Sequence, residues 1–428
     1  AKSKAKKTEN ASKIETEKQR IRDAITVNVR TREQNIEHAV IFDGPTNSGK
    51  THRALERLAE DYEANRDGVY VYAGPLRMLA REVYDKMRGV YGDDVCGYWT
   101  GEELINKDAR IICCTPEMAP MTGDSIVLDE THWMVDCDRG SHWTTLLIGG
   151  AYRNFYAICA TEATKPISQL LDDASHLDIE KCDRYTPITY CGDISYRNLH
   201  KQTGVVAFSE KSCYAICGAI NRVGKVKAGV LYGAMPLPVR ERQIKRFTDG
   251  ELDVLVTTDV IGHGVNIPFE NIVFAETQKF DGVERRSLKT WEAAQIAGRA
   301  GRYGMHSCGR VYTLGGMPWF TCNAKLVSKA TQAAAGKVRT DLKIDGASVT
   351  PHLSDLACDD PNKLRFCLTA WADKVKQHEF PLPIKPSEMP QRLSILDHAA
   401  DYNRAKVFPH AMKSGKWKMD VETLWKLS

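Results

Sequence analysis

Short apolar runs alternate with stretches of helical spacing along the chain from about residue 38. The apolar runs have the length of strands and are Ala39–Phe42, Val69–Ala73, Arg110–Cys114, Ser125–Leu128 and Tyr156–Ala160. Between them, Lys50–Leu58 and Arg77–Arg88 place apolar residues at helical spacing. Strands that alternate with helices are typical of a parallel sheet covered by helices on both faces. The pattern therefore predicts an α/β domain.

The same alternation of expected strands and helices begins again after the polar segment Lys181–Pro187, which we interpret as the join between two domains. The second set of expected strands is Gly204–Phe208, Lys227–Tyr232, Leu252–Val256, Asn271–Ala275 and Arg310–Thr313, and the expected helices are Glu210–Val223, Pro238–Phe247 and Leu288–Ala300. Beyond about Gly316, residues 323–343 have helical spacing, whereas prolines interrupt residues 380–390. The expected fold class is α/β, with two tandem parallel-sheet domains and a mainly helical C-terminal region. The expected boundaries are 1–37 for a basic, flexible N-terminal arm, 38–182 and 183–318 for the two domains, and 319–428 for the C-terminal region.

Charge is distributed unevenly along the 428 residues. The net charge is +4, but residues 1–30 alone hold nine Lys/Arg against four Asp/Glu, so the rest of the chain is close to neutral. Such an arm is either a solvated segment or a non-specific RNA contact, and nucleic-acid binding by the domains must rely on local patches. No apolar run is long enough to span a membrane. The thirteen cysteines form no CxxC pair, which favours free thiols in a reducing compartment.

A glycine-rich loop lies between the first expected strand and the first expected helix. It fits the pattern G-x-x-x-x-G-K-[ST] and consists of Gly44, Pro45, Thr46, Asn47, Ser48, Gly49, Lys50 and Thr51. In such a loop, backbone N–H groups and the helix N-terminus surround phosphates. Lys50 supplies positive charge to the β- and γ-phosphates, and the Thr51 hydroxyl suits Mg²⁺. The loop predicts binding of ATP with Mg²⁺.

Two adjacent acids follow the apolar strand Ser125–Leu128. Asp129 is placed to hold Mg²⁺ together with Thr51, and Glu130 is placed to polarise an attacking water as general base. Two acids at the end of a buried strand are costly unless they are used in this way. The pair therefore extends nucleotide binding to nucleotide hydrolysis.

Asp129-Glu130-Thr131-His132, following such a phosphate loop, resembles the DExH box of superfamily-two helicases. Further motifs of that superfamily occur in the expected order and are Pro75–Glu82, Thr115–Glu117, Ala160–Thr164, Thr257–Gly264 and Gln295–Arg302. A narrower likeness, to the RNA helicase of the mitochondrial degradosome and its bacterial relatives, is carried by the phosphate loop, Tyr72–Asp85, Thr100–Glu103, Val206–Lys211 and Gln295–Arg302. In that family the motif is usually Asp-Glu-Ile-Gln, whereas the last two residues of the motif in this chain are Thr131 and His132.

The resemblance implies two RecA-like domains and an ATP-dependent RNA helicase. It also implies 3′-to-5′ unwinding, delivery of RNA to an exoribonuclease, and a mitochondrial location. The sequence itself leaves DNA open as a substrate, and leaves open an RNA-stimulated ATPase that remodels or clamps RNA–protein complexes without processive unwinding.

The resemblance also assigns roles to residues of the second domain. Gln295, Arg299 and Arg302 are expected to complete the ATPase site when the domains close, and their spacing places them on one helix face. Asp259 and Gly262 are expected to contact the ribose or to transmit closure. His132 is either a partner of Gln295 across the cleft or a structural histidine.

RNA is expected to cross both domains through hydroxyls and backbone N–H groups that bind phosphates without reading base sequence. The candidate contacts are Arg77, Thr100, Thr115, Ser209, Gly233 and Thr258. Arg77 has an alternative role on a solvated helix face.

Overall fold

The computed structural model describes residues 14–29, 32, 34–261, 267–280, 284–301, 304–360, 363–378, 382–387, 389, 391–396 and 421–427. The chain divides into two compact units. The larger is formed by Gln34–His132 and Ala151–Lys343, and the smaller by Ala1–Glu33, Trp133–Gly150 and Ile344–Ser428. Within the described ranges, no helix is both long and apolar enough to cross a lipid bilayer.

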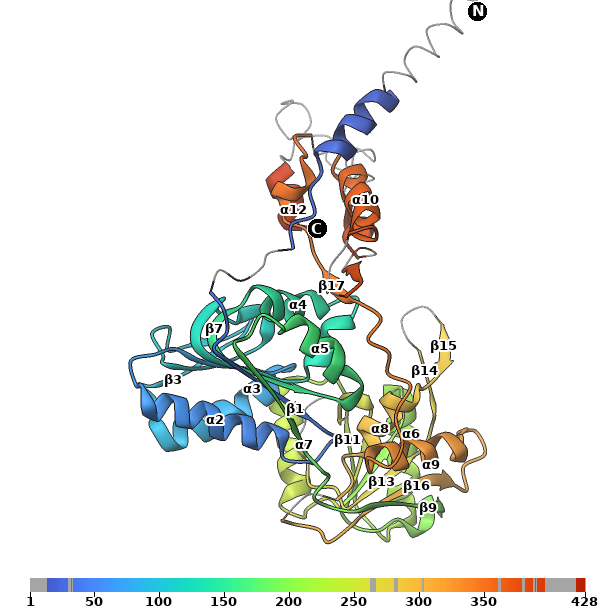
Figure 1. Ribbon diagram of the computed structural model, residues 1–428. Helices are drawn as coiled ribbons and strands as arrows, with labels where there is room; N and C mark the ends of the chain where they lie inside the picture. Colours follow the sequence, from blue (N-terminus) through green and yellow to red (C-terminus); the bar gives the residue numbers. More distant parts are fainter. Residues whose placement is uncertain are drawn as a thin grey trace, which may run out of the picture. The chain divides into compact units, whose positions relative to one another are not determined.

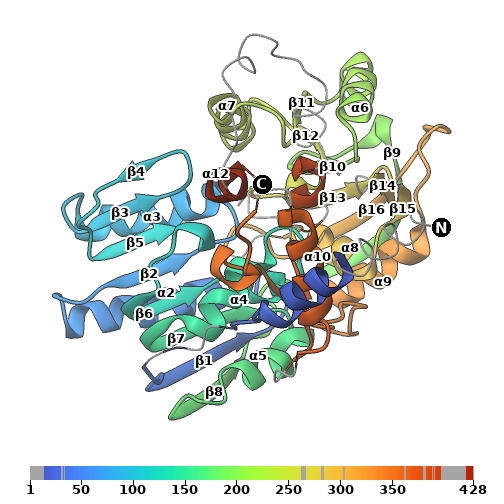
Figure 2. The ribbon, with the colours of Figure 1, turned by 90° about the horizontal axis from the view of Figure 1, so that it is seen from above.

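The first sheet of the larger unit has eight strands in the order β4-β3-β5-β2-β6-β7-β1-β8 (Figure 2). The strands are β1 His38–Asp43, β2 Tyr70–Ala73, β3 Cys96–Trp99, β4 Leu104–Ile105, β5 Ile111–Cys114, β6 Thr122–Leu128, β7 Ala151–Cys159 and β8 His176–Lys181. The pairs are parallel except at β3–β4. The connecting helices of this unit are α2 Lys50–Ala64, α3 Arg77–Tyr91 and α5 Thr164–Leu170, with short turns η1 Pro116–Met118 and η3 Thr161–Ala163.

Helical periodicity explains how α2 and α3 attach to this sheet. In α2, Ala54, Leu58 and Tyr62 are four residues apart and all buried. In α3, Ala80 and Met87 are buried at the two ends of a similar stripe. Residues at such spacing share one helix face, and burying that face against apolar strands is what stabilises the helices.

The second sheet has six parallel strands in the order β11-β12-β10-β13-β16-β9. The strands are β9 Ile188–Ser195, β10 Thr203–Val206, β11 Ala228–Leu231, β12 Val254–Thr257, β13 Asn271–Phe274 and β16 Gly309–Gly315. The other elements of this domain are α6 Glu210–Val223, α7 Leu237–Thr248, α8 Thr290–Ala297, α9 Ala324–Ala334, η4 Tyr196–Asn198, η5 Asp259–Ile261 and the hairpin β14 Gln278–Phe280 with β15 Arg285–Ser287 (Figure 1).

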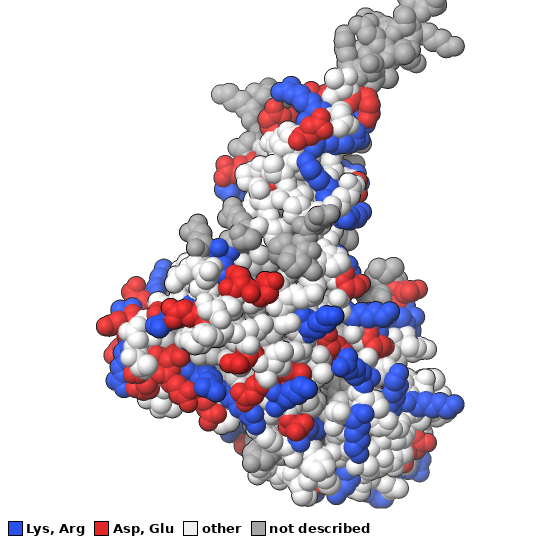
Figure 3. All heavy atoms as spheres, in the orientation of Figure 1, with Lys and Arg blue, Asp and Glu red and all other residues white. Residues whose placement is uncertain are grey.

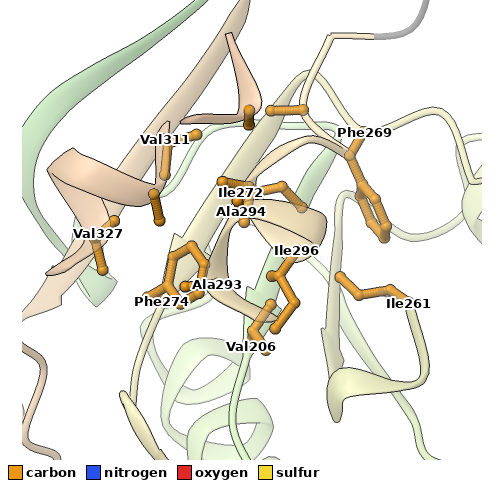
Figure 4. Packing of buried hydrophobic residues seen from close by; sticks show 14 of the residues in the cluster. Val206, Ile261, Phe269, Ile272, Phe274, Ala293, Ala294, Ile296, Val311 and Val327 are labelled. Atoms are coloured by element: carbon orange, nitrogen blue, oxygen red, sulfur yellow. The ribbon is translucent and has the colours of Figure 1, made fainter. Parts of the chain in front are cut away.

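Alternation along each strand divides the core of the second domain into two layers. On β13, Ile272 and Phe274 belong to one buried cluster, while Val273 belongs to the other. Figure 4 shows Ala293 and Ile296 of α8 packed on the side that carries Ile272 and Phe274. Side chains of successive strand residues point to opposite faces, so a fully apolar strand needs helices on both sides.

The smaller unit is built on its own apolar core. Its elements are α4 Gly140–Gly149, β17 Ala347–Val349, η6 Leu353–Leu356, α10 Leu364–Val375, β18 Ile384–Pro386 and α12 Val421–Leu427, and η2 Thr131–Val135 leads into it. Part of the basic segment 1–37 belongs here, because residues 14–24 are helical and Ile21 and Ile25 are buried in the same cluster as Leu368 and Trp371 of α10. Residues 1–13 lie outside the described residues.

The expected fold class is confirmed, with two parallel α/β sheets followed by a mostly helical C-terminal segment. Two helices end earlier than expected. The helix expected over 323–343 ends at Ala334, followed by Gly336 with a φ of 74°. The helix expected over Leu288–Ala300 ends at Ala297. A glycine in the left-handed region follows the end of α9, whereas long-range contacts hold the residues that follow α8.

Candidate nucleotide site

The phosphate loop joins the buried strand β1 to α2, which begins at Lys50. Asn47 and Gly49 adopt positive φ values of 58° and 79°, which bend the backbone into a closed loop. The Lys50 ammonium group donates to the carbonyl oxygens of Gly44 and, at 3.0 Å, Pro45. The cation therefore lies inside the loop, where phosphates would be bound.

Asp129 lies at the carboxyl end of β6 and is only 4% exposed. Its Oδ2 accepts hydrogen bonds from Tyr72 Oη at 2.8 Å and Thr51 Oγ1 at 3.4 Å, and its Oδ1 accepts from the backbone N–H of Glu130 at 2.8 Å. Burial and the neighbouring Glu130 raise the pKa of Asp129 to about 6. A hydroxyl oxygen and a carboxylate oxygen that lie together in this way fit Mg²⁺, which prefers oxygen ligands and retains several waters.

His132, which follows β6 of the first sheet, contacts Gln295 of α8. Gln295 Nε2 lies 3.3 Å from His132 Nε2, and His132 Nδ1 lies 3.4 Å from Glu130 Oε2. An amide nitrogen can only donate, so His132 Nε2 accepts and its Nδ1 carries the proton that faces the carboxylate. Burial lowers the pKa of His132, which keeps the ring neutral. The contact between His132 and Gln295 that the family resemblance implied is therefore confirmed.

These groups line one cavity of about 920 Å³ in the larger unit. Its walls include the whole phosphate loop, Asp129, Glu130, His132, Gln295 and Arg299. Arg299 lies beyond the end of α8. The expectation that it shares a helix face with Gln295 was therefore wrong, although both residues reach the same cavity.

Of three other expected residues, the structure places one elsewhere and does not describe the other two. Asp259 does not line it, and instead lies 3.6 Å from the ammonium group of Lys279, which also binds Glu292. Gly262 and Arg302 lie outside the described residues.

The six candidate RNA contacts follow the carboxyl ends of strands in the two sheets. Thr100, Thr115 and Arg77 follow β3, β5 and β2, whereas Ser209, Gly233 and Thr258 follow β10, β11 and β12. Parallel strands end at a common edge, so each set lies along one sheet edge.

Several of these side chains also have local roles. Thr100 Oγ1 accepts from the backbone N–H of Glu103 at 3.1 Å, and Ser209 caps α6 by accepting from Ser212 N at 3.0 Å. Arg77 forms an ion pair with Glu102. On the face in Figure 3, basic and acidic side chains are interspersed on the left of the larger unit, and basic side chains are more frequent on its right.

Sequence reasoning missed four residues that line the cavity or contact the segments around it. Tyr72, which binds Asp129, reads as one more core residue of an apolar strand. Thr340 donates to Glu162 Oε1 from its backbone N at 2.6 Å and its Oγ1 at 2.7 Å. The next residue, Asp341, accepts from the N–H groups of Thr290 and Trp291 at the start of α8, at 3.0 and 2.9 Å. No signal marked Thr340 and Asp341, because they lie in the segment expected to be helical.

The fourth of these residues is Arg184, which lies in the polar join between the domains. Its guanidinium donates to Thr46 O at 2.8 Å and to Gly298 O at 2.9 Å.

Family models match both sheets of the chain. Residues 26–181 match the DEXQ-box helicase domain of Suv3, and residues 188–304 match the helicase conserved C-terminal domain. The DEXQ box of the first model is named for a glutamine in fourth place, and the fourth residue of the corresponding motif in this chain is His132.

Curated relatives match over about two thirds of this chain. The mitochondrial ATP-dependent RNA helicase SUV3 of Candida albicans is 36% identical over 62% of this chain and 37% of its own length. Saccharomyces cerevisiae SUV3 is 33% identical over 71% of this chain and 42% of its own length. The Oryza sativa SUV3 protein is 37% identical over 65% of this chain and 47% of its own length. The chain thus spans less than half the length of these relatives.

Among solved structures, S. cerevisiae Dbp5 bound to RNA and ADP BeF3 is similar, with a TM-score of 0.52 and 17% identity over 71% of this chain and 84% of Dbp5. At that identity the likeness concerns the fold alone. Together with the matched models, the relatives show that the chain belongs to the Suv3 family of superfamily-two helicases.

Proposed function

We propose that this chain is an ATP-dependent RNA helicase, in which ATP hydrolysis between the two α/β domains drives 3′-to-5′ translocation on RNA and unwinding. One observation carries the proposal: a single cavity is lined by the phosphate loop and Glu130 from the first domain and by Gln295 and Arg299 from the second. A site divided between two domains makes hydrolysis depend on their closure. The names of the SUV3 relatives support RNA as the substrate.

Each residue has a defined part in the proposed reaction. Lys50 and the loop N–H groups bind the phosphates, and Thr51 and Asp129 hold Mg²⁺, which would neutralise phosphate charge. Glu130 orients and deprotonates the attacking water, and His132 links that carboxylate to Gln295. Arg299, and Arg302 by the same family motif, stabilise charge on the γ-phosphate.

RNA is proposed to run along the sheet edges that carry Arg77, Thr100 and Thr115 in the first domain and Ser209, Gly233 and Thr258 in the second. Hydroxyls and backbone N–H groups at these positions suit phosphates. Delivery of the product to an exoribonuclease, and a mitochondrial site of action, are part of the same proposal. They rest on the family resemblance and on the names of the relatives.

The test is strand displacement on matched RNA and DNA duplexes that carry either a 3′ or a 5′ single-stranded overhang. The proposal expects ATP-dependent unwinding of the RNA duplex with the 3′ overhang, and loss of both hydrolysis and unwinding in Glu130→Gln. Hydrolysis without strand displacement would instead identify an RNA-stimulated clamp. Unwinding retained in Glu130→Gln would overturn the mechanism.

A further inference from the structure

Arg184 lies between β8 and β9, in the segment that joins the two domains, and its guanidinium group binds four backbone carbonyls and, at 3.4 Å, the hydroxyl of Thr46. Its Nη1 donates to Thr46 O at 2.8 Å and to Gly298 O at 2.9 Å, its Nη2 donates to Ala300 O, and its Nε donates to Thr186 O at 2.8 Å. One guanidinium therefore joins the phosphate loop, the join and the segment after α8.

The positions of these carbonyls place Arg184 next to Arg299. Residues 298 and 300 flank Arg299, so the backbone is held on both sides of it. The planar guanidinium directs its N–H groups in fixed directions, and this fork fixes several acceptors relative to one another. The backbone that carries Arg299 is thereby fixed relative to Thr46 of the phosphate loop.

Two further contacts bring the same segments together. Asn47 Nδ2 donates to Gly301 O at 2.6 Å. A Cβ atom added to Gly298 would lie 1.7 Å from Thr46 Oγ1, so only a glycine fits at that position. The phosphate loop and residues 298–301 therefore pack with almost no space between them.

The charge of Arg184 is consistent with a role beside bound phosphate. Burial and the nearby Arg299 lower the pKa of Arg184 to about 10, so the side chain remains a cation at neutral pH. Two guanidinium groups near one another repel, and an anion bound beside Arg299 would offset that repulsion.

We propose that Arg184 is a positioning residue of the ATPase site, which holds the backbone of Arg299 against the phosphate loop so that Arg299 can reach the γ-phosphate. The inference rests on the proposed function, because it needs Arg299 to act on bound nucleotide. Arg184 binds carbonyl groups and not the nucleotide, so its loss acts through Arg299. A displacement of about 1 Å of a catalytic group can lower a rate about 100-fold, whereas binding by Lys50 and the loop is retained.

The experiment measures the RNA-stimulated ATPase of Arg184→Met, Arg184→Lys, Arg299→Lys and the double variant Arg184→Met/Arg299→Lys. Arg310→Met is the matched control, because Arg310 binds Glu270 at 2.6 Å and does not line the cavity. The expected result is a kcat about 10- to 100-fold lower in Arg184→Met with KM for ATP changed less than about threefold. Arg184→Lys retains the charge without the fork and should have an intermediate kcat. Arg310→Met should match the unmodified chain.

The double variant separates positioning from a general structural role. If Arg184 acts through Arg299, adding Arg184→Met to Arg299→Lys should lower kcat by less than about threefold more. The inference would be overturned if the fold-reductions in kcat of the two single variants multiply in the double variant. It would also be overturned if Arg184→Met raises KM with unchanged kcat, or leaves kcat unchanged. If Arg184→Met does not fold, a kcat equal to that of the unmodified chain in folded Arg184→Lys would overturn it. If Arg299→Lys itself has normal kcat, the role of Arg299 in the proposed function fails, and the inference fails with it.

Discussion

Replacing Gly298 by alanine should separate the two halves of the ATPase site without unfolding either domain. Gly298 has a φ of −61° and a ψ of −13°, which alanine adopts readily, so the backbone itself does not require glycine. The requirement comes from contact, because the added Cβ would lie 1.7 Å from Thr46 Oγ1 and 2.9 Å from Thr46 Cβ. Rotation of the threonine would relieve the first overlap but leave the second.

The required displacement can be worked out from these distances. Carbon atoms pack at about 3.5–4.0 Å, so residues 298–301 must move away from the phosphate loop by about 0.6–1.1 Å. Overpacking of this kind costs about 1–3 kcal/mol. We expect the phosphate loop and residues 298–301 to separate while the packing of the core stays unchanged. A shift of this size at Arg299 should lower kcat about 100-fold, or about 2.7 kcal/mol in activation free energy.

The assay is steady-state ATP hydrolysis at saturating RNA, together with thermal unfolding of each variant. Thr46→Gly removes the two nearest atoms that the new methyl group would meet, so Thr46→Gly/Gly298→Ala should recover to within about threefold of Thr46→Gly alone. A normal kcat in Gly298→Ala would refute the reasoning. So would a folded double variant that stays as slow as Gly298→Ala.

Two further predictions concern buried titratable groups. Burial keeps the pKa of His132 below its usual 6.5, so the unfolded chain takes up the proton first and the stability present above about pH 6.5 is lost as the pH falls. In His132→Gln, the new side chain should still reach Gln295, and ATPase activity should stay within about threefold. In urea unfolding, this variant should lose less stability between pH 7 and pH 5 than the unmodified chain. Equal losses would contradict this. Burial alone would raise the pKa of Glu292, but hydrogen bonds from Arg286 and Lys279 hold it at about 2. The stability that this carboxylate contributes is present above about pH 4.5 and is lost as the pH falls toward 2. Glu292→Gln should therefore lower the free energy of unfolding by about 2 kcal/mol at pH 7, and the difference should shrink by pH 4; a difference independent of pH would count against the ion pairs.

The sequence predicts those parts of the structure whose signals are local. The phosphate loop is flanked by an apolar run and a helical stretch, and β1 and α2 occupy those positions. The two acids after β6 could be placed because a buried strand leads directly to them. Edge strands gave weaker signals. No strand was expected at β8, whose residues are exposed or only partly buried, because a strand without a buried face has no apolar alternation to detect.

Contacts between distant segments could not be predicted from one sequence. Arg184 is 138 residues from Thr46 and 114 residues from Gly298, and most of the atoms it binds are backbone carbonyl oxygens, which every residue has. Its importance is therefore invisible in the composition of the join. Asp341 likewise meets the start of α8 from 50 residues away. The ends of α8 and α9 depend on such contacts, which explains why both helices were expected to be longer.

These long-range contacts converge on α8 from three directions. Asp341 binds its first N–H groups, and the adjacent Thr340 binds Glu162 of the first domain. His132 meets Gln295 inside the helix, and Arg184 binds the carbonyls just beyond its last turn. Because α8 is only eight residues long and packs rigidly on its own sheet, a rotation of the second domain away from the first would strain all three connections together. Opening of the site should therefore be cooperative, and these connecting side chains should set its cost.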